Sequence, residues 1–323
     1  MKRPCLVRVT GALCLLLAGW GQGARADEPA ANAQVRPKYI RLARDKSEEP
    51  VALQTAIVRF APADATKGNL EVELVGAVHV GEKSYYEALN KRFENYDVVL
   101  FELVAPEGTQ IPKGGRPSTH PIGMLQNGMK NLLGLEHQLE YVDYTKKNML
   151  HADMSPDEFS KSMEERGESF FAMFFRMMGQ AMAQQSVQKN QTSDFDLIAA
   201  LFDPDRAGAL KRVMAEQFEN ADGMMQALEG PEGSTIITER NKVALAKLAE
   251  QIAAGKKKIA IFYGAGHLGD MEQRLLADFQ LKRTGEEWLD AWKLTKAQRA
   301  RKPKPAAAKK AASITPRRAP QTV

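Results

Sequence analysis

Three short apolar runs, separated by amphipathic segments, constrain the fold of this chain more than any other feature. The runs NLEVELVGAV, DVVLFEL and KKIAIFY are rich in β-branched or aromatic residues, which is typical of buried strands. The segments EKSYYEALNKRFENY and TERNKVALAKLAEQIAAG have the apolar spacing of helices. A strand, a helix and a further strand in this order predict a right-handed parallel unit. We therefore predict an α/β fold with a mostly parallel central sheet and flanking helices.

The remaining parts of the domain follow from local patterns. The run VALQTAIVRF, the turn residues ADATKGN and the first apolar run predict a hairpin. The segment HLGDMEQRLLADF predicts a closing helix, after which FQLKRT is short and strand-like and Glu286 is expected in a polar turn. Residues 121–228 are mostly helix-like and predict a helical insertion or cap. The whole α/β domain is expected to span residues 27–295.

Residues 1–26 have the pattern of a cleaved secretory signal peptide. A basic start precedes the apolar run GALCLLLAGW and the small-residue site Ala24-Arg25-Ala26. Trp20 occupies the position where a lipoprotein would have cysteine, so we expect a periplasmic or secreted protein that is not a lipoprotein. Both cysteines, Cys5 and Cys14, lie in this segment, so any metal site in the mature chain must use His, Asp, Glu or backbone oxygen.

The net charge of +5 conceals an acidic domain between basic ends. The tail, residues 296–323, holds nine basic and no acidic residues, whereas residues 27–295 carry a net charge of −8. The tail is expected to be disordered. A solubilising extension is its simplest explanation, and contact with anionic envelope surfaces is the main alternative. The acidic domain gives nucleic-acid binding little support, and no apolar run after the signal is long enough to span a membrane.

The segment ESFFAMFFRMMGQAMAQQ, residues 168–185, allows three interpretations. A packed core helix is the simplest of them. The others are an adaptable lid over an apolar or peptide substrate and a methionine-rich copper site.

The stretch IAIFYGAGHLGD contains two competing motifs. Gly264, Gly266 and Gly269 match the glycine fingerprint of dinucleotide-binding folds, whereas Gly264 and His267 form a Gly-x-x-His at a strand end. The dinucleotide interpretation requires further strands after the fingerprint and an acidic residue at the end of the next one. Because only one short strand-like stretch follows, we do not expect NAD or a related cofactor.

The histidine interpretation is supported by a second copy of the motif. GAVH places His79 after one strand as GAGH places His267 after another, and DVVLFELV places Glu102 near the end of a third. The carboxyl ends of parallel strands converge on one crevice, so these side chains can share a pocket. Two imidazoles and a carboxylate suit Zn²⁺, Mn²⁺ or Co²⁺ with positions left for water. Without a metal, Glu102 or one histidine can act as general base.

The ordered set GAVH, VLFE, ERN and YGAGHL resembles the TraB/PrgY/GumN family, which includes the TIKI metalloproteases. That family belongs to a superfamily with EreA-like erythromycin esterases and ChaN haem-binding lipoproteins. The resemblance covers about Val72 to Trp292, and YTKKNMLHADMSPDEF is similar to the family's middle segment, with Asn148 and Asp153 in recurrent positions. His151 lies beside them but is expected at the surface.

The resemblance implies an active site and leaves its metal dependence open. The implied catalytic residues are His79, Glu102, Arg240 and His267, with Glu239, Asn241 and Asp153 in support and His79, Glu102 and His267 as metal ligands. The TIKI branch implies a divalent metal, and the esterase branch implies a metal-free mechanism. Arg240 is expected to stabilise an oxyanion or anchor a substrate carboxylate. His120 in a Pro-rich loop and His137 on an amphipathic helix receive no role.

These observations predict a hydrolase that cleaves a peptide or ester bond and depends on a divalent metal. One alternative is a non-catalytic envelope protein that sequesters haem or a peptide, with a histidine as axial ligand in the haem case. A weaker alternative is an envelope interaction protein that works through the basic tail.

Overall fold

The computed structural model describes residues 39–114, 132–169, 194–219 and 232–295, together with positions 128, 130, 172–173 and 229–230. The predicted signal peptide and basic tail lie outside the described residues, as does all of the Met/Phe-rich segment except residues 168–169 and 172–173. None of the helices in the described part has the length and hydropathy that a membrane span needs.

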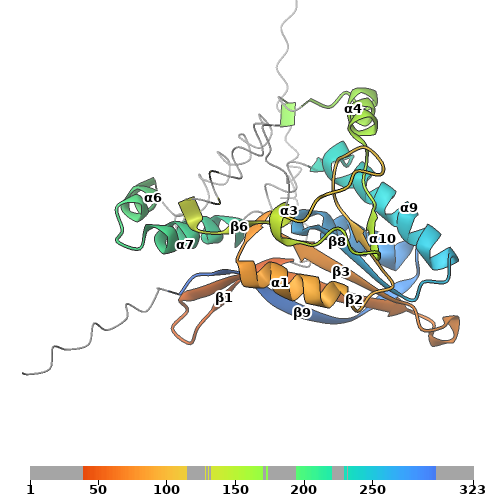
Figure 1. Cartoon of the computed structure of the whole chain (residues 1–323), viewed down its shortest axis with the longest axis horizontal. Helices are drawn as coiled ribbons and strands as arrows, with labels where there is room; N and C mark the ends of the chain where they lie inside the picture. The colour runs from red at the N-terminus through yellow and green to blue at the C-terminus, as the bar shows by residue number, and fades with distance from the viewer. Residues whose placement is uncertain are drawn as a thin grey trace, which may run out of the picture. The chain divides into compact units, whose positions relative to one another are not determined.

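A seven-stranded sheet forms the centre of the described part, and the predicted α/β class is confirmed (Figure 1). Strands β3, β8, β5 and β7 lie side by side and parallel, while β1, β2 and β9 form an antiparallel side. The strand bounds are β1 Ile40–Arg44, β2 Pro50–Pro62, β3 Glu71–Ala77, β5 Val98–Phe101, β7 Met149–His151, β8 Lys258–Gly264 and β9 Leu281–Lys293.

The predicted hairpin is confirmed, because β2 and β3 pair antiparallel with Ile57 opposite Val75. The prediction for the segment after the closing helix was wrong. Residues 281–293 form one continuous strand, β9, along β2, and Glu286 is opposite Val58 within it. The strand carries many charged residues, so its sequence has a low β propensity and looks like a turn. Its backbone pairing with β2 compensates for that low propensity.

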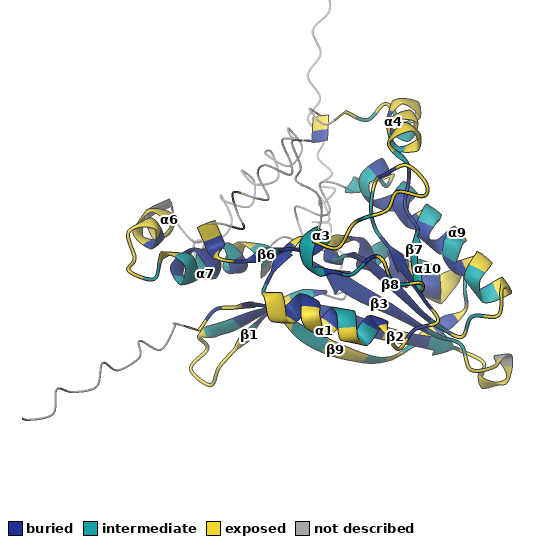
Figure 2. Ribbon diagram, viewed as in Figure 1, coloured by how far each residue is buried: buried dark blue, intermediate teal, exposed yellow. Residues whose placement is uncertain are grey.

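Helices cover both faces of the sheet. Alternate strand residues point to opposite faces, so Val99 belongs to the core under α1 (Lys83–Phe93), and Leu100 belongs to the core under α9 (Arg240–Ala253). The closing helix α10, Leu268–Ala277, packs in the same core as α9. Figure 2 shows β3 and β8 buried between these helices. Both faces are therefore largely apolar, with the ion-paired Glu73 of β3 as a buried exception.

The middle of the chain is not one continuous helical insertion. It contains β7, which completes the parallel part of the sheet, and β6 (Glu136–His137), which pairs with β4 (Val80–Gly81). A three-residue strand is too short to give a periodic signal. The helices described between residues 121 and 228 are α3 Gln138–Tyr141, α4 Pro156–Glu165, α6 Asp194–Leu201 and α7 Arg206–Glu219.

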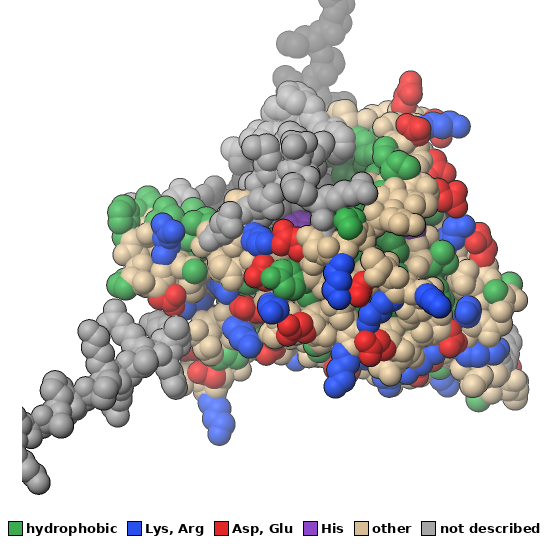
Figure 3. Space-filling view, in the orientation of Figure 1, with side chains coloured by type: hydrophobic (Ala, Val, Ile, Leu, Met, Phe, Trp, Pro, Cys, Tyr) green, Lys and Arg blue, Asp and Glu red, His purple; other side chains and the backbone are tan. Residues whose placement is uncertain are grey.

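The face drawn in Figure 3 carries charged side chains of both signs over most of its area. Hydrophobic side chains gather over α6, where Ile198 and Leu201 are exposed and the adjoining Phe202 is 84% exposed. Helix α7 anchors this region to the domain, because the Phe218 ring packs edge-to-face on buried Trp292 of β9.

Candidate functional site

The carboxyl ends of the four parallel strands lie at one edge of the sheet, and the predicted polar residues follow them. Glu102 comes directly after β5, Asp153 lies two residues after β7, and His79 lies two residues after β3. His267 ends a 3₁₀ turn, Ala265–His267, that follows β8. Helix α9 begins at this edge with Arg240 and Asn241. Hydrogen bonds join Glu102, Asp153 and Arg240 in one cluster and His267 with Asn241 in an adjoining one.

Arg240 links the two carboxylates. Its Nε and Nη2 donate to the two oxygens of Asp153 at 2.9 and 2.6 Å, and Nη2 also donates to Glu102 Oε1 at 2.6 Å. Nη1 donates to the Ile236 carbonyl at 3.4 Å. Burial lowers the pKa of Arg240, but the hydrogen bonds to Asp153 and the charge of Glu102 outweigh it and raise the pKa above its ordinary value. A permanent cation at a helix N-terminus is unfavourable, and the paired carboxylates offset it.

Glu102 is held in one orientation by donors at both of its oxygens. Oε1 accepts from Arg240, and Oε2 accepts from the backbone N–H of Gly264 at 2.6 Å. A β-carbon at Gly264 would lie 3.2 Å from Oε2, so a glycine allows this close approach. Burial would raise the pKa of Glu102, but His267, Arg240, His79 and the Gly264 N–H together lower it to about 2. The side chain is therefore a carboxylate at neutral pH.

This arrangement also bears on the dinucleotide fingerprint. In that motif, backbone N–H groups of the glycine turn receive the pyrophosphate. Here Gly264 N–H donates to the buried carboxylate of Glu102, and a phosphate approaching it would meet that negative charge. Glu286, an acidic residue that follows the fingerprint in sequence, lies within an antiparallel strand.

Asn241 and Asp270 determine which nitrogen of His267 carries a proton. Asn241 Nδ2 donates to the His267 carbonyl at 3.0 Å and to Asp270 Oδ2 at 2.9 Å. Both partners only accept, so the amide cannot be reversed and its oxygen faces His267 Nδ1 at 2.7 Å. Nδ1 must therefore donate, and the lone pair of neutral His267 is on Nε2.

Nε2, the nitrogen of His267 that carries the lone pair, lies close to Glu102. His267 Nε2 lies 3.5 Å from Glu102 Oε1, and the two side chains are only 7% and 11% exposed. Burial lowers the pKa of His267 most strongly, and Arg240 and His79 lower it further, although Glu102 raises it. His267 is therefore a neutral base near pH 7, with an anionic oxygen beside its free nitrogen.

His79 differs from the other predicted site residues because it is exposed. It lies close enough to lower the pKa of Glu102. Burial is the main cause that lowers the pKa of His137, and His79 lowers it further. Its carbonyl accepts from Gln138 N at 2.9 Å, which attaches the loop after β3 to α3. Among these residues, His79 is therefore the imidazole best placed to meet a ligand from solvent.

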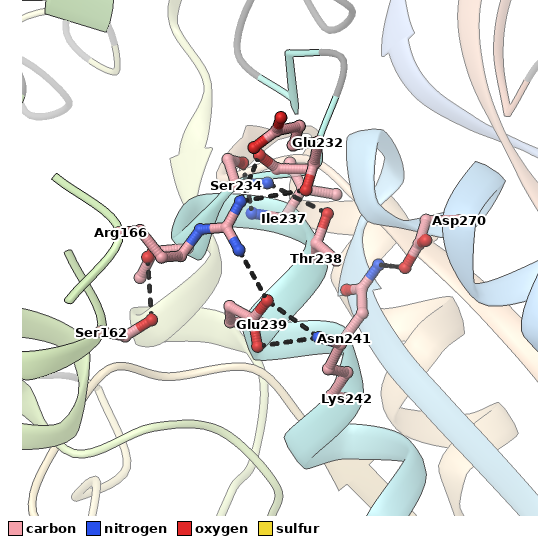
Figure 4. Close-up of polar contacts among 12 residues, drawn as sticks. Ser162, Arg166, Glu232, Ser234, Ile237, Thr238, Glu239, Asn241, Lys242 and Asp270 are labelled. Atoms are coloured by element: carbon pink, nitrogen blue, oxygen red, sulfur yellow. Dashed lines mark hydrogen bonds and ion pairs between the residues drawn. The ribbon is translucent and has the colours of Figure 1, made fainter. Parts of the chain in front are cut away.

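Glu239 points away from this cluster, although it precedes Arg240 in sequence. Its carboxylate contacts Arg166 Nη1 at 3.2 Å and Lys242 Nζ at 2.9 Å (Figure 4). Any support that it gives the site is therefore indirect.

The other candidates have structural positions. Asn148 donates to the carbonyls of Phe93 and Tyr96 and connects β7 to the end of α1. His151 is partly buried and within 2.6 Å of the Leu103 carbonyl, so it is less exposed than expected. His137 was predicted to lie on an amphipathic helix. It lies instead in β6 and caps the N-terminus of α3. His120 lies outside the described residues.

Two of the three predicted metal ligands are engaged in hydrogen bonds in this structure. Both oxygens of Glu102 already accept hydrogen bonds, one from a cation, and His267 Nδ1 is used by Asn241. Within the described ranges, no three His, Asp or Glu side chains are arranged to hold an ion.

Sequence reasoning missed two residues of this network, Asp270 and Tyr263. An acidic residue in the first turn of a helix is explained by the helix dipole alone, so Asp270 gave no separate signal. Tyr263 lies within an apolar strand, where its ring packs edge-to-face on His267 and its hydroxyl donates to the Ala152 carbonyl.

The chain matches no protein-family model, and no curated protein and no solved structure is significantly similar to it. The family resemblance therefore stays a prediction.

Proposed function

We propose that this protein is a hydrolase in which Glu102 and His267 activate a water molecule for attack on an ester or amide carbonyl. The observation that supports this most is the 3.5 Å separation of His267 Nε2 and Glu102 Oε1. Both atoms are hydrogen-bond acceptors when His267 is neutral, so they repel each other unless a donor lies between them. A water can donate to both while its oxygen stays available to a substrate.

The proposed reaction moves one proton through His267. The water oxygen attacks the carbonyl carbon as Nε2 accepts a proton, and Glu102 stabilises the resulting imidazolium. The imidazolium then donates that proton to the leaving oxygen or nitrogen as the bond to carbon breaks. An acid and an alcohol or amine are released, and His267 is neutral again. Asn241 orients the imidazole, a role that asparagine also has in Cys-His-Asn proteases.

Arg240 and His79 have different roles in this proposal. The N–H groups of Arg240 donate to Asp153, Glu102 and a backbone carbonyl. In this proposal Arg240 therefore orients Glu102 and keeps it ionised. It does not bind the oxyanion, which was the role expected from the sequence. Exposed His79 is the donor proposed for the oxyanion.

Metal dependence and haem binding stay predictions. The site carries two carboxylates against one guanidinium, so its charge favours an added cation. The hydrogen bonds at Glu102 and His267 would have to rearrange to bind one. The proposed mechanism therefore uses no metal.

A panel of chromogenic esters and short peptides tests the proposal directly. We expect turnover of at least one ester or peptide class, unchanged after dialysis against EDTA and absent from identically purified His267→Gln. Turnover that appears only with Mn²⁺, Co²⁺ or Zn²⁺ would support the metal-dependent prediction instead. No turnover together with a Soret band on haem titration would replace the hydrolase with a binding protein.

The activity should fall in acid with an apparent pKa below 6.5, the ordinary value for histidine. Neutral His267 is the base, and burial lowers its pKa, so the active form predominates at pH 7. Below the lowered pKa, kcat/KM should decrease about tenfold per pH unit. The measurement is kcat/KM against pH, compared with the titration of His267 by NMR. An acid limb above pH 6.5, or one that differs from the titration, would contradict the assignment of His267 as base.

A further inference from the structure

The turn that precedes Arg240 has an unusual geometry. Residues Thr235–Glu239 form a π-helical turn, with Glu239 N–H donating to the Ser234 carbonyl at 3.0 Å. A π-helical turn contains one residue more than an α-helical turn and is rare in proteins. One residue corresponds to about 100° of rotation around a helix. If this turn relaxed to α-helix, Arg240 and Asn241 would rotate relative to Glu102 and His267.

Arg166, just after α4, contacts this turn with most of its guanidinium. Nη2 donates to the carbonyls of Gly233 and Glu232 at 2.7 and 3.0 Å. Nη1 donates to Glu239 Oε1 at 3.2 Å (Figure 4). The guanidinium therefore contacts the backbone before the turn and the side chain at its end.

Two neighbours of Arg166 strengthen the same attachment. Glu168, which pairs with Arg166 at 2.8 Å, accepts the backbone N–H of Thr235 at 3.0 Å and so caps the turn. Ser162 of α4 lies 2.9 Å from the Thr235 hydroxyl. The segment 162–168 thus contacts both ends of the π-helical turn.

We propose that Arg166 is a positioning residue that maintains the π-helical turn. By doing so it preserves the hydrogen bond between Asn241 and His267 Nδ1 and the hydrogen bond between Arg240 and Glu102. Glu239 acts as its partner in this attachment. The inference about geometry stands on these contacts, whereas its consequence for turnover rests on the proposed function.

The closing experiment measures the tautomer of His267, which does not depend on any activity. The protein is labelled with ¹⁵N-histidine, and its five histidines make the imidazole spectrum simple to assign with His267→Gln. In wild type at pH 8 we expect a proton on Nδ1 and none on Nε2. In Arg166→Gln we expect a mixture of the two tautomers.

Lys242→Gln is the matched control. Lys242 also pairs with Glu239, at 2.9 Å, but its side chain is 52% exposed. It should keep the wild-type tautomer. Glu239→Gln removes one contact of Arg166 and should give an intermediate spectrum, which keeps the proposal testable if Arg166→Gln does not fold. A wild-type tautomer in a folded Arg166→Gln variant, or in Glu239→Gln should Arg166→Gln not fold, would overturn it.

A second readout connects the positioning to catalysis. If the proposed hydrolase reaction is found, Arg166→Gln should lower kcat by about tenfold or more with a smaller change in KM, because misorientation affects the reacting groups. A tautomer change in a chain without hydrolytic activity would refute the proposed function and leave the positioning role intact.

Discussion

Glu102→Gln is expected to lower kcat by about 10²- to 10⁴-fold, the usual contribution of a positioned acid or base. The carboxylate accepts Gly264 N–H with one oxygen and Arg240 with the other, and glutamine has only one oxygen to offer. The variant also removes the charge that would stabilise the imidazolium of His267. The measurement is kcat on the substrate found in the panel, with the unfolding free energy determined in parallel.

Glu73→Gln is the control for this prediction. Glu73 is also buried and ion-paired, with Arg92 at 2.9 Å, but it lies within β3 and not at the strand ends. It should lower stability and leave kcat nearly unchanged. If Glu102→Gln and Glu73→Gln lower kcat equally, Glu102 has no special part in the reaction.

Arg240→Met is expected to destabilise the fold by about 3–5 kcal/mol, the usual effect of removing one partner of a buried ion pair. Glu102 Oε1 and Asp153 Oδ2 both lie 2.6 Å from Arg240 Nη2, so the variant leaves two buried carboxylates facing each other. The Asp153 side chain is 0% exposed and cannot regain water without a structural change. Urea denaturation at pH 7 measures the loss.

Two comparisons make the Arg240 result interpretable. Arg59→Met also removes a partner of a buried carboxylate, Glu73, but Arg59 is 46% exposed and Arg92 remains, so we expect a loss of less than about 1 kcal/mol. Asp153→Asn combined with Arg240→Met should recover part of the stability, because only one carboxylate is left unpaired. Equal losses for Arg240→Met and Arg59→Met would mean that the cluster around Arg240 contributes no more than a surface ion pair.

The parallel part of the fold was predictable because its signals are local. Strands β5 and β8 are almost wholly apolar runs and β3 is rich in β-branched and other apolar residues, and α1 and α9 have clear helical spacing, since each buries one face. Strand β9 was not predictable, because its many charged residues conceal a strand that pairing with β2 stabilises. Strand β7 is three residues long and gave no signal.

By itself the sequence determined that strand-end side chains come together. Parallel strands place their carboxyl ends at one edge, so the strand-end positions of Glu102 and His267 were enough to predict a shared site, whereas Arg240 and Asn241 were implied only by the family resemblance.

Only the tertiary structure decided what those side chains can do. Arg240 donates hydrogen bonds to two carboxylates, and Asn241, oriented by Asp270, determines the proton on His267. Arg166 contacts Glu239, which lies 73 residues away in the sequence. Hydrogen bonds between residues so distant in the chain depend on distances and angles that arise only when the whole domain has packed.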